Sequence, residues 1–189
     1  MWYTLALLLH ILGAVGLFVA VSLIIIAFIR MRQASTFEQM REWAWLANVA
    51  GKSIVFVAFI ILVPALYMVI IAWGFATPWV IAALITFVAL AVMGATMNGK
   101  NIGRIVALTQ ATSSRSVSGE LRLRLFAPQL WFAEAVRLML LFGVLCLMTI
   151  KPNMLFSVLI LGGMLILGLI LGMLAQRLPG PLSQKQPPA

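Results

Sequence analysis

The sequence predicts an all-α membrane protein, a bundle of five transmembrane helices with the N-terminus outside and the C-terminus in the cytoplasm. Of its 189 residues, 64% are hydrophobic and only 9% are charged, whereas a soluble domain is about half apolar and about a quarter charged. Five apolar runs approach the roughly 20 residues that a helix needs to cross a bilayer. Within a single domain over 1–176, we expect spans at 3–29, 53–73, 79–98, 130–150 and 154–175.

The distribution of basic residues predicts the orientation of these spans. The formal net charge is +9, and nearly all Lys and Arg lie in 30–52, 99–129 and the tail 177–189. The turns on the other side hold only Lys151. Because cytoplasmic loops carry an excess of Lys and Arg, we expect these three segments in the cytoplasm, with the Pro- and Gln-rich tail disordered. The charge then indicates contact with anionic lipid headgroups rather than with nucleic acid.

The first span is expected to be a retained helix rather than a cleaved signal, because no positively charged segment precedes Trp2 and no cleavage site follows. Gly13 and Gly16 form a stripe of small residues on which another helix can pack closely. In the last span, Gly168 and Gly172 form a GxxxG pattern of the same kind.

Two interfacial segments are expected on the cytoplasmic side. Ser35 and Glu38 fit a capping box, and the helix that they begin is expected to lie at headgroup level before the second span. Pro64 should then kink that span. The longer connection is expected to carry helical extensions at 102–111 and 119–126. On the opposite side, tryptophans flank the turn 74–78 and indicate an aromatic belt.

A polar cluster is expected near the cytoplasmic ends of the spans, with Asn48 as a further candidate beside its four members Lys52, Asn98, Glu134 and Arg137. Glu134 and Arg137 are three residues apart, so they share a helix face and can pair. The functional interpretation is a proton or ion path with Glu134 as its titratable member. We favour a structural clasp in which Lys52 snorkels to the interface, since charge costs less near the headgroups.

A second candidate site is centred on His10, the only histidine, in the outer half of the first span. Met68, Cys146 and Met148 occupy the outer halves of their own spans, and nitrogen with sulfur ligands suits copper or a haem iron. The alternative is that His10 bonds a neighbouring carbonyl and that the methionines are packing residues. We favour this alternative and expect no cofactor, and a single histidine excludes a bis-histidine haem within one chain.

Catalytic motifs are missing from the sequence. The chain contains no aspartate, and therefore no Ser–His–Asp set, and it contains no CxxC, HExxH, CxxCH or P-loop. Its single cysteine allows no intrachain disulfide. We therefore expect a protein that is not an enzyme.

Two short stretches carry a family resemblance, the opening LLLHILGAVGLFVAVSL and the end of the fourth span, LCLMTIKP. They resemble small bacterial integral membrane proteins of unknown function that neighbour the copper-resistance protein D type. The resemblance covers most of the chain from Leu5 to Pro152 and implies a multi-helix bundle in the plasma (inner) membrane. A copper association would pass to this chain only through His10, and the further histidines expected of a copper path are missing.

Together these observations predict a non-enzymatic multi-pass membrane protein, a structural or accessory subunit. We expect it to bind a membrane partner subunit or to form a homo-oligomer through the glycine faces of its first and fifth spans. The alternative is a small transporter, or a copper- or haem-linked membrane protein, that uses His10 or Glu134.

Overall fold

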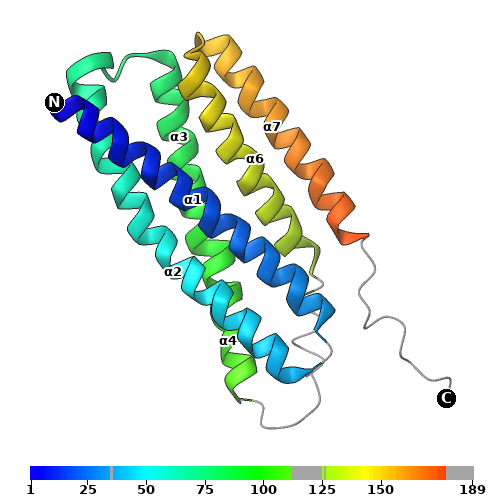
Figure 1. Ribbon diagram of the computed structural model, residues 1–189. Coiled ribbons are helices and arrows are strands. Elements are labelled where there is room, and N and C mark those ends of the chain that lie inside the picture. Colours follow the sequence, from blue (N-terminus) through cyan, green and yellow to red (C-terminus); the bar gives the residue numbers. More distant parts are fainter. Residues whose placement is uncertain (35, 112–124, 126, 178–189) are drawn as a thin grey trace, which may run out of the picture.

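The computed structural model is a bundle of long helices joined by short connections (Figure 1). It describes residues 1–34, 36–111, 125 and 127–177, without the side chains of 97–101 and 110–111. The described residues contain no strand. The α-helices, with two π-helical segments labelled η, are α1 (Trp2–Gln33), α2 (Phe37–Met68), η1 (Val69–Trp73), α3 (Pro78–Met93), η2 (Gly94–Asn98), α4 (Gly99–Ala111), α6 (Pro128–Ile150) and α7 (Met154–Gln176).

Five helical segments of the described chain are long and apolar enough to cross a membrane, which confirms the number of spans predicted. They are Trp2–Gln33, Phe37–Trp73, Pro78–Thr96, Pro128–Ile150 and Met154–Gln176. This architecture fits a multi-pass membrane protein.

The region before the second span differs from the prediction of a separate interfacial segment. That segment and the second span form one continuous helix, α2, whose 32 residues make it about 48 Å long. Its N-cap is Thr36, whose Oγ1 accepts the N–H of Gln39 at 3.3 Å. The predicted capping box is therefore replaced by the next hydroxyl, and Ser35 lies outside the described residues.

The connection after the third span begins as a helix. The expected extension at 102–111 falls within α4, which follows η2 without a break. Of the second expected extension, 119–126, only Leu125 lies among the described residues, where it is helical.

Glycines lie in the two most extensive helix contacts, α1 with α2 and α6 with α7. A Cβ on Gly13 would lie 2.7 Å from Ile61 Cγ1, and a Cβ on Gly168 would lie 2.7 Å from Val136 Cα. A Cβ on Gly172 would likewise lie 3.0 Å from the Cα of Phe132 on α6. The glycine faces that the sequence suggested for self-association are therefore occupied within the chain.

The largest core cluster lies where α1, α2, α4 and α6 meet at the end of the bundle away from the N-terminus. Trp131 is buried there and donates its Nε1–H to the carbonyl of Leu125 at 3.1 Å. The Arg32 guanidinium lies 4.8 Å from the Trp131 ring centroid and donates to the carbonyl of Ala175 at 3.2 Å. Arg32 thus joins the end of α1 to α6 and to the last turn of α7.

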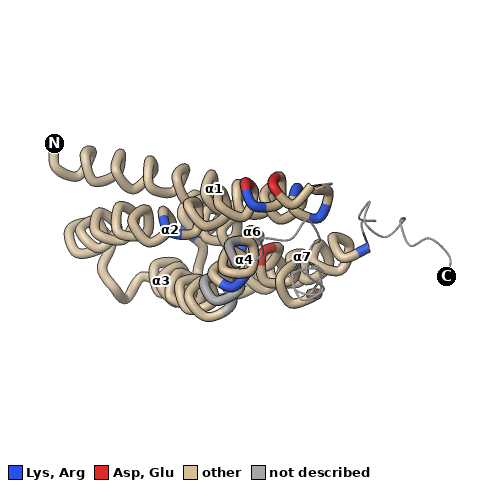
Figure 2. The backbone as a smooth tube through the Cα atoms, turned by 90° about the horizontal axis from the view of Figure 1, so that it is seen from below, with Lys and Arg blue, Asp and Glu red and all other residues tan. Residues whose placement is uncertain are grey.

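Aromatic residues gather at the opposite end. The centroid of the Trp73 ring lies 6.4 Å from that of Tyr3 and 4.9 Å from that of Trp79. Lys151 Nζ lies 5.2 Å from the Trp73 centroid. The charged positions, coloured in Figure 2, gather mainly over the part of the bundle away from the N-terminus. The two ends of the bundle therefore differ in charge.

Candidate functional site

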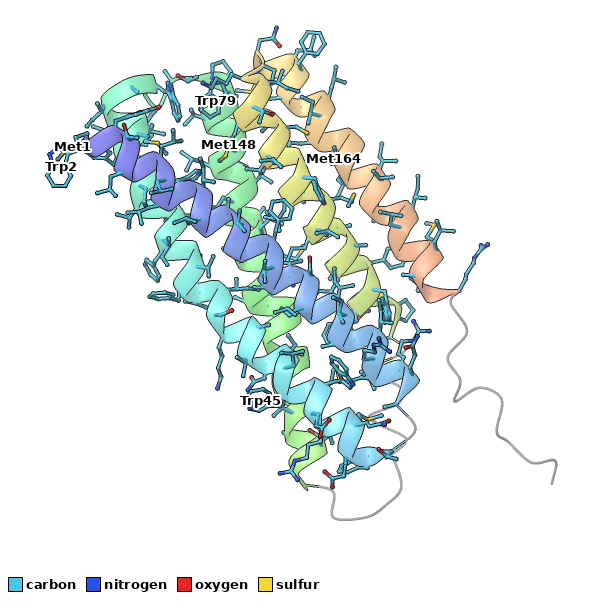
Figure 3. All side chains as sticks on the ribbon, in the orientation of Figure 1. Met1, Trp2, Trp45, Trp79, Met148 and Met164 are labelled. Atoms are coloured by element: carbon cyan, nitrogen blue, oxygen red, sulfur yellow. The ribbon has the colours of Figure 1, made fainter. Side chains whose placement is uncertain are left out.

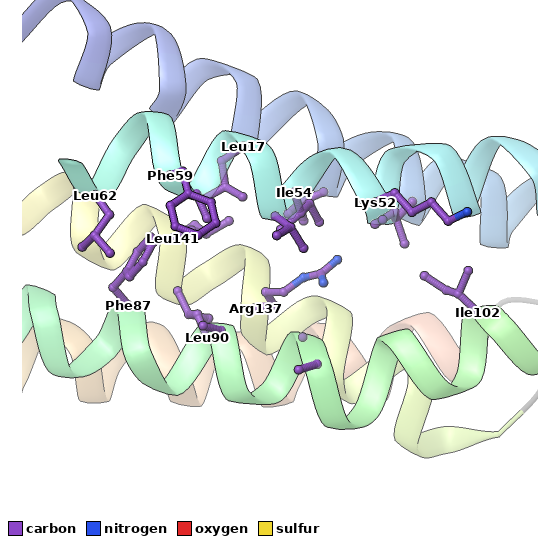
Figure 4. Close-up of a pocket in the computed structure, with 18 of the residues that line it drawn as sticks. Leu17, Lys52, Ile54, Phe59, Leu62, Phe87, Leu90, Ile102, Arg137 and Leu141 are labelled. Carbon is purple, nitrogen blue, oxygen red and sulfur yellow. The ribbon is translucent and has the colours of Figure 1, made fainter. Parts of the chain in front are cut away.

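A cavity of about 610 Å³ lies among α1, α2, α6 and the continuous α3–η2–α4 segment (Figure 4). Its wall is mainly apolar, with polar side chains at one end. The apolar side chains that matter most here are Leu17, Ile54, Phe59, Leu62, Phe87, Leu90 and Leu141, and the polar ones are Asn48, Lys52 and Arg137.

The cavity exists because small residues line α3 and η2 where they face α2. Ala91, Gly94 and Ala95 line it, and a Cβ on Gly94 would have no heavy atom within 4 Å. Across the gap, α2 packs on α1 and α4, whereas α3 packs on α6 and α7. Because α2 and α3 are held by different neighbours, a space remains between them where only small side chains face it.

The cavity opens sideways between α2 and α3. On the α2 side of the opening, Val55 and Phe59 are each 62% exposed. On the other side, Ala91 and Ala95 are also exposed. Since these surfaces belong to segments apolar enough to span a membrane, the opening would face lipid.

The polar end is built on an ion pair within α6. Arg137 Nη2 donates to Glu134 Oε2 at 2.5 Å, and the two residues are 5% and 2% exposed. Arg137 also lines the cavity, and its Nε, which is buried, has no hydrogen-bond partner among the described residues. A guanidinium has five N–H donors in a rigid fork, and a buried ion pair is stable only when the remaining donors are satisfied. The site therefore presents a buried, unpaired donor.

The predicted polar cluster is partly assembled at this cavity. Lys52 lines it from α2, on the side where Ile102 lies and away from Leu62 and Phe87 (Figure 4). Glu134 joins through its pair with Arg137. Asn98 belongs to η2, which contributes lining residues, but its own side chain lies outside the described part. Lys52 and Arg137, from different helices, thus share one cavity.

His10 occupies a separate, closely packed position. It is 7% exposed, and its Nδ1 lies 2.9 Å from the carbonyl oxygen of Ile61. Because a carbonyl can only accept, Nδ1 carries the proton and donates. Nε2 lies 3.5 Å from Met148 Sδ, so in the neutral ring a nitrogen lone pair faces a thioether sulfur. Pro64 lies inside α2 and lacks the N–H that would bond the carbonyl of Ile60, the residue before the one that His10 meets.

The other two proposed sulfur ligands lie on the same helices as the contacts of His10. Met68 is buried at the end of α2, and Cys146 is half-buried on α6. Figure 3 shows Met148 on α6 in the half of the bundle that holds Trp79. The described residues include no group of three or more His, Cys, Asp or Glu that could hold a metal ion. Of the predicted set, the structure brings together His10 and Met148.

Sequence reasoning missed the apolar wall. Phe59, Leu62, Phe87 and Leu90 are ordinary apolar residues within apolar spans, and nothing in their spacing marks them as lining a cavity. The available signal was the spacing of the small residues Ala91, Gly94 and Ala95, which share one face of a helix and leave room there when no larger side chain reaches across.

Comparison of the chain with protein-family models, with curated proteins and with solved structures finds no match. The cavity and its polar end are therefore the features of the chain that bear on its function.

Proposed function

We propose that the chain is a non-enzymatic, multi-pass protein of the plasma membrane that holds an amphipathic small molecule between α2 and α3. The observation that supports this function is the cavity itself, which is apolar along its length and polar at one end. Its volume of about 610 Å³ lies within the roughly 300–1,000 Å³ of small-molecule sites. The sideways opening gives such a molecule a route from the bilayer.

The cavity fits the depth of one leaflet. Trp73 follows Lys52 by 21 residues, or about 32 Å of helix, close to the roughly 30 Å hydrocarbon core. We therefore assign Trp73 and Lys52 to opposite interfaces. Leu62 is ten residues from Lys52, about 15 Å along the helix and so near the midplane. An amphiphile of one leaflet would enter with its head beside Lys52 and its tail toward Leu62.

We assign that leaflet to the cytoplasmic side, with the N-terminus outside. Arg30, Arg41, Arg104 and Arg177 lie in the segments at the basic end, and the positive-inside rule places such segments in the cytoplasm. Reporter fusions after Gln176 should be active in the cytoplasm, and fusions before Met1 should be active outside. If both reporters are found on the same side of the membrane, this topology is contradicted.

A holding role fits the residues of the cavity better than catalysis does. Glu134, the acid beside the cavity, is already paired with Arg137. Among the described lining residues the one potential nucleophile is Lys52, which is exposed, and none of the others is a general base that could activate it. We propose that the loaded protein acts as an accessory subunit, presenting or retaining its ligand for a membrane partner.

Photolabelling of the purified full chain in nanodiscs tests this function. The probes are palmitate and hexadecanol, each carrying a diazirine on the chain. We expect labelling of the cavity residues Phe59 and Leu90 to exceed labelling of Ile166, which is 61% exposed on the outer face of α7. Equal labelling of cavity and outer face by both probes would refute the proposal.

A matched pair of variants separates the cavity from its surroundings. Ala91→Trp should fill the space and lower cavity labelling, because Ala91 lines the cavity. Val88→Trp adds the same bulk one turn earlier on α3, at a 60% exposed position outside the lining. Labelling should therefore persist in the Val88 variant.

A second candidate function, copper binding, is favoured by one observation at His10. Its Nε2 and Met148 Sδ lie side by side, and imidazole and thioether are donors that suit Cu(I). The Nδ1–H bond to Ile61 is the kind of support that orients a metal-binding histidine. A porphyrin between the two atoms would force them apart, so the contact favours copper over haem. Cu(I) titration against a chelator tests this function, and equal affinity in wild type and His10→Ala would refute it.

A further inference from the structure

We infer that the cavity selects an amphiphile with an oxyanion head and one acyl chain, and that Arg137 and Lys52 bind the head. The inference rests on the proposed holding function and goes beyond it by assigning the chemical class of the ligand. Three features of the site support it: the unpaired Nε–H of Arg137, the balance of charge, and the placement of the apolar wall.

Of the Arg137 guanidinium nitrogens, Nη2 is hydrogen-bonded and Nε has no partner among the described residues. Nη2 donates to Glu134, which fixes the guanidinium on the cavity side of α6. In Figure 4 the Arg137 side chain projects into the space between α2 and the α3–η2–α4 segment. The buried Nε lacks a partner among the described residues, and an oxyanion is the strongest acceptor for such a donor. A carboxylate or phosphate oxygen at this point would complete the set of donors.

The charge at the polar end also calls for an anion. Among the described side chains of this end, Glu134 and Arg137 carry opposite charges, and Lys52 adds one further positive charge. The described lining residues include no acid. A monoanionic head would neutralise the site, whereas a zwitterionic head would bring a second cation toward Lys52.

The apolar wall gives the direction of the tail. Figure 4 places Phe59, Leu62 and Phe87 on one side of Arg137, and Lys52 on the other. A chain that leaves the head at Arg137 therefore runs along a single apolar path toward Leu62, between α2 and α3. The path has room for one acyl chain, because the cavity volume of about 610 Å³ is that of a small-molecule site.

The test compares the two photolabels at equal mole fraction in phosphatidylcholine nanodiscs. For each probe, labelling at Leu90 is divided by labelling at Ile166, and the anion preference is the palmitate ratio over the hexadecanol ratio. We expect a preference of about tenfold in wild type, which corresponds to about 1.4 kcal/mol, the scale of a charge-assisted hydrogen bond. Unlabelled palmitate and hexadecyl phosphate, used as competitors, then distinguish a carboxylate from a phosphate head.

Two variants locate the preference. Arg137→Lys keeps a cation for Glu134 but removes the Nε–H, and Lys52→Gln removes the surplus charge. Each should bring the preference toward one while hexadecanol still labels the cavity, which reports an intact fold. Arg30→Gln is the matched control, because Arg30 is an exposed cation outside the cavity lining.

Each outcome decides between the two levels of the proposal. If wild type labels equally with both probes inside the cavity, the ligand class is wrong while the holding function stands. If neither probe favours the cavity, the holding function itself fails. If Arg137→Lys abolishes labelling by both probes, that variant has lost its fold and the Lys52→Gln variant becomes the test. An anion preference in Lys52→Gln equal to that of wild type then overturns the inference.

Discussion

The contact between α6 and α7 gives a sharp test of the packing, through a single methyl group added at Gly168. A Cβ at this position would lie 2.7 Å from Val136 Cα and 3.2 Å from the carbonyl oxygen of Ala135. Both atoms belong to the backbone, so no flexible side chain can move aside. Gly168→Ala must therefore push the two helices apart or distort one of them.

Gly163 supplies the matched control on the same helix. It is exposed, and a Cβ there would have no heavy atom within 4 Å. Both substitutions replace a helical glycine by alanine, so both gain the same roughly 0.5–1 kcal/mol of helix propensity. That gain cancels in the comparison. Overpacking typically costs about 1–3 kcal/mol, and we expect Gly168→Ala to be less stable than Gly163→Ala by this amount.

The measurement is the free energy of unfolding of each variant in mixed detergent micelles, followed by circular dichroism as the denaturing detergent increases. Equal unfolding free energies for the two variants would contradict the close approach of α6 and α7. Crosslinking in membranes gives an independent readout. Gly168 packs against α6 of its own chain. Gly168→Ala should therefore lower stability without changing the yield of crosslinked oligomer.

Three further predictions concern single side chains. Glu134→Gln should destabilise the fold by about 3–5 kcal/mol, because it leaves the Arg137 charge buried without its partner, and the double variant with Arg137→Gln should recover part of the loss in the same unfolding assay. Lys151 has φ 52, so Lys151→Gly should relieve roughly 1 kcal/mol of backbone strain, less the contact with Trp73, as measured by thermal unfolding. Thr36→Ala should cost about 1 kcal/mol through the lost N-cap, and stability equal to wild type would show that the cap contributes nothing.

The sequence was sufficient for the number of candidate membrane spans, because apolar length determines that number. It was less informative about which faces meet, since helices that are apolar all round have no hydrophobic stripe pointing inward. Small residues carried that information in part. Gly13, Gly168 and Gly172 do mark close approaches, but Gly162 and Gly163 have open space where a Cβ would stand. A glycine thus permits a helix contact without specifying one.

The region from Phe37 to Gly51 shows a different limit. Its mixture of tryptophans and charges is typical of a segment lying at headgroup level, yet it forms the first part of α2 without a break and packs on α1 and α4. Buried alanines, among them Ala44 and Ala47, let these helices approach. Tertiary contacts of this kind cannot be read from local composition.

Helix α6 carries both the close contact with α7 and the polar end of the cavity. Val136 contacts Gly168 of α7, and the next residue, Arg137, lines the cavity on another side of the same helix. Consecutive residues on a helix point about 100° apart, so one rigid turn of α6 holds both contacts. The position of the Arg137 fork is therefore set partly by how closely α7 can approach. The absence of a side chain at Gly168 matters to the site as well as to stability, because any shift of α6 at Val136 would move the Nε–H that we assign to the ligand.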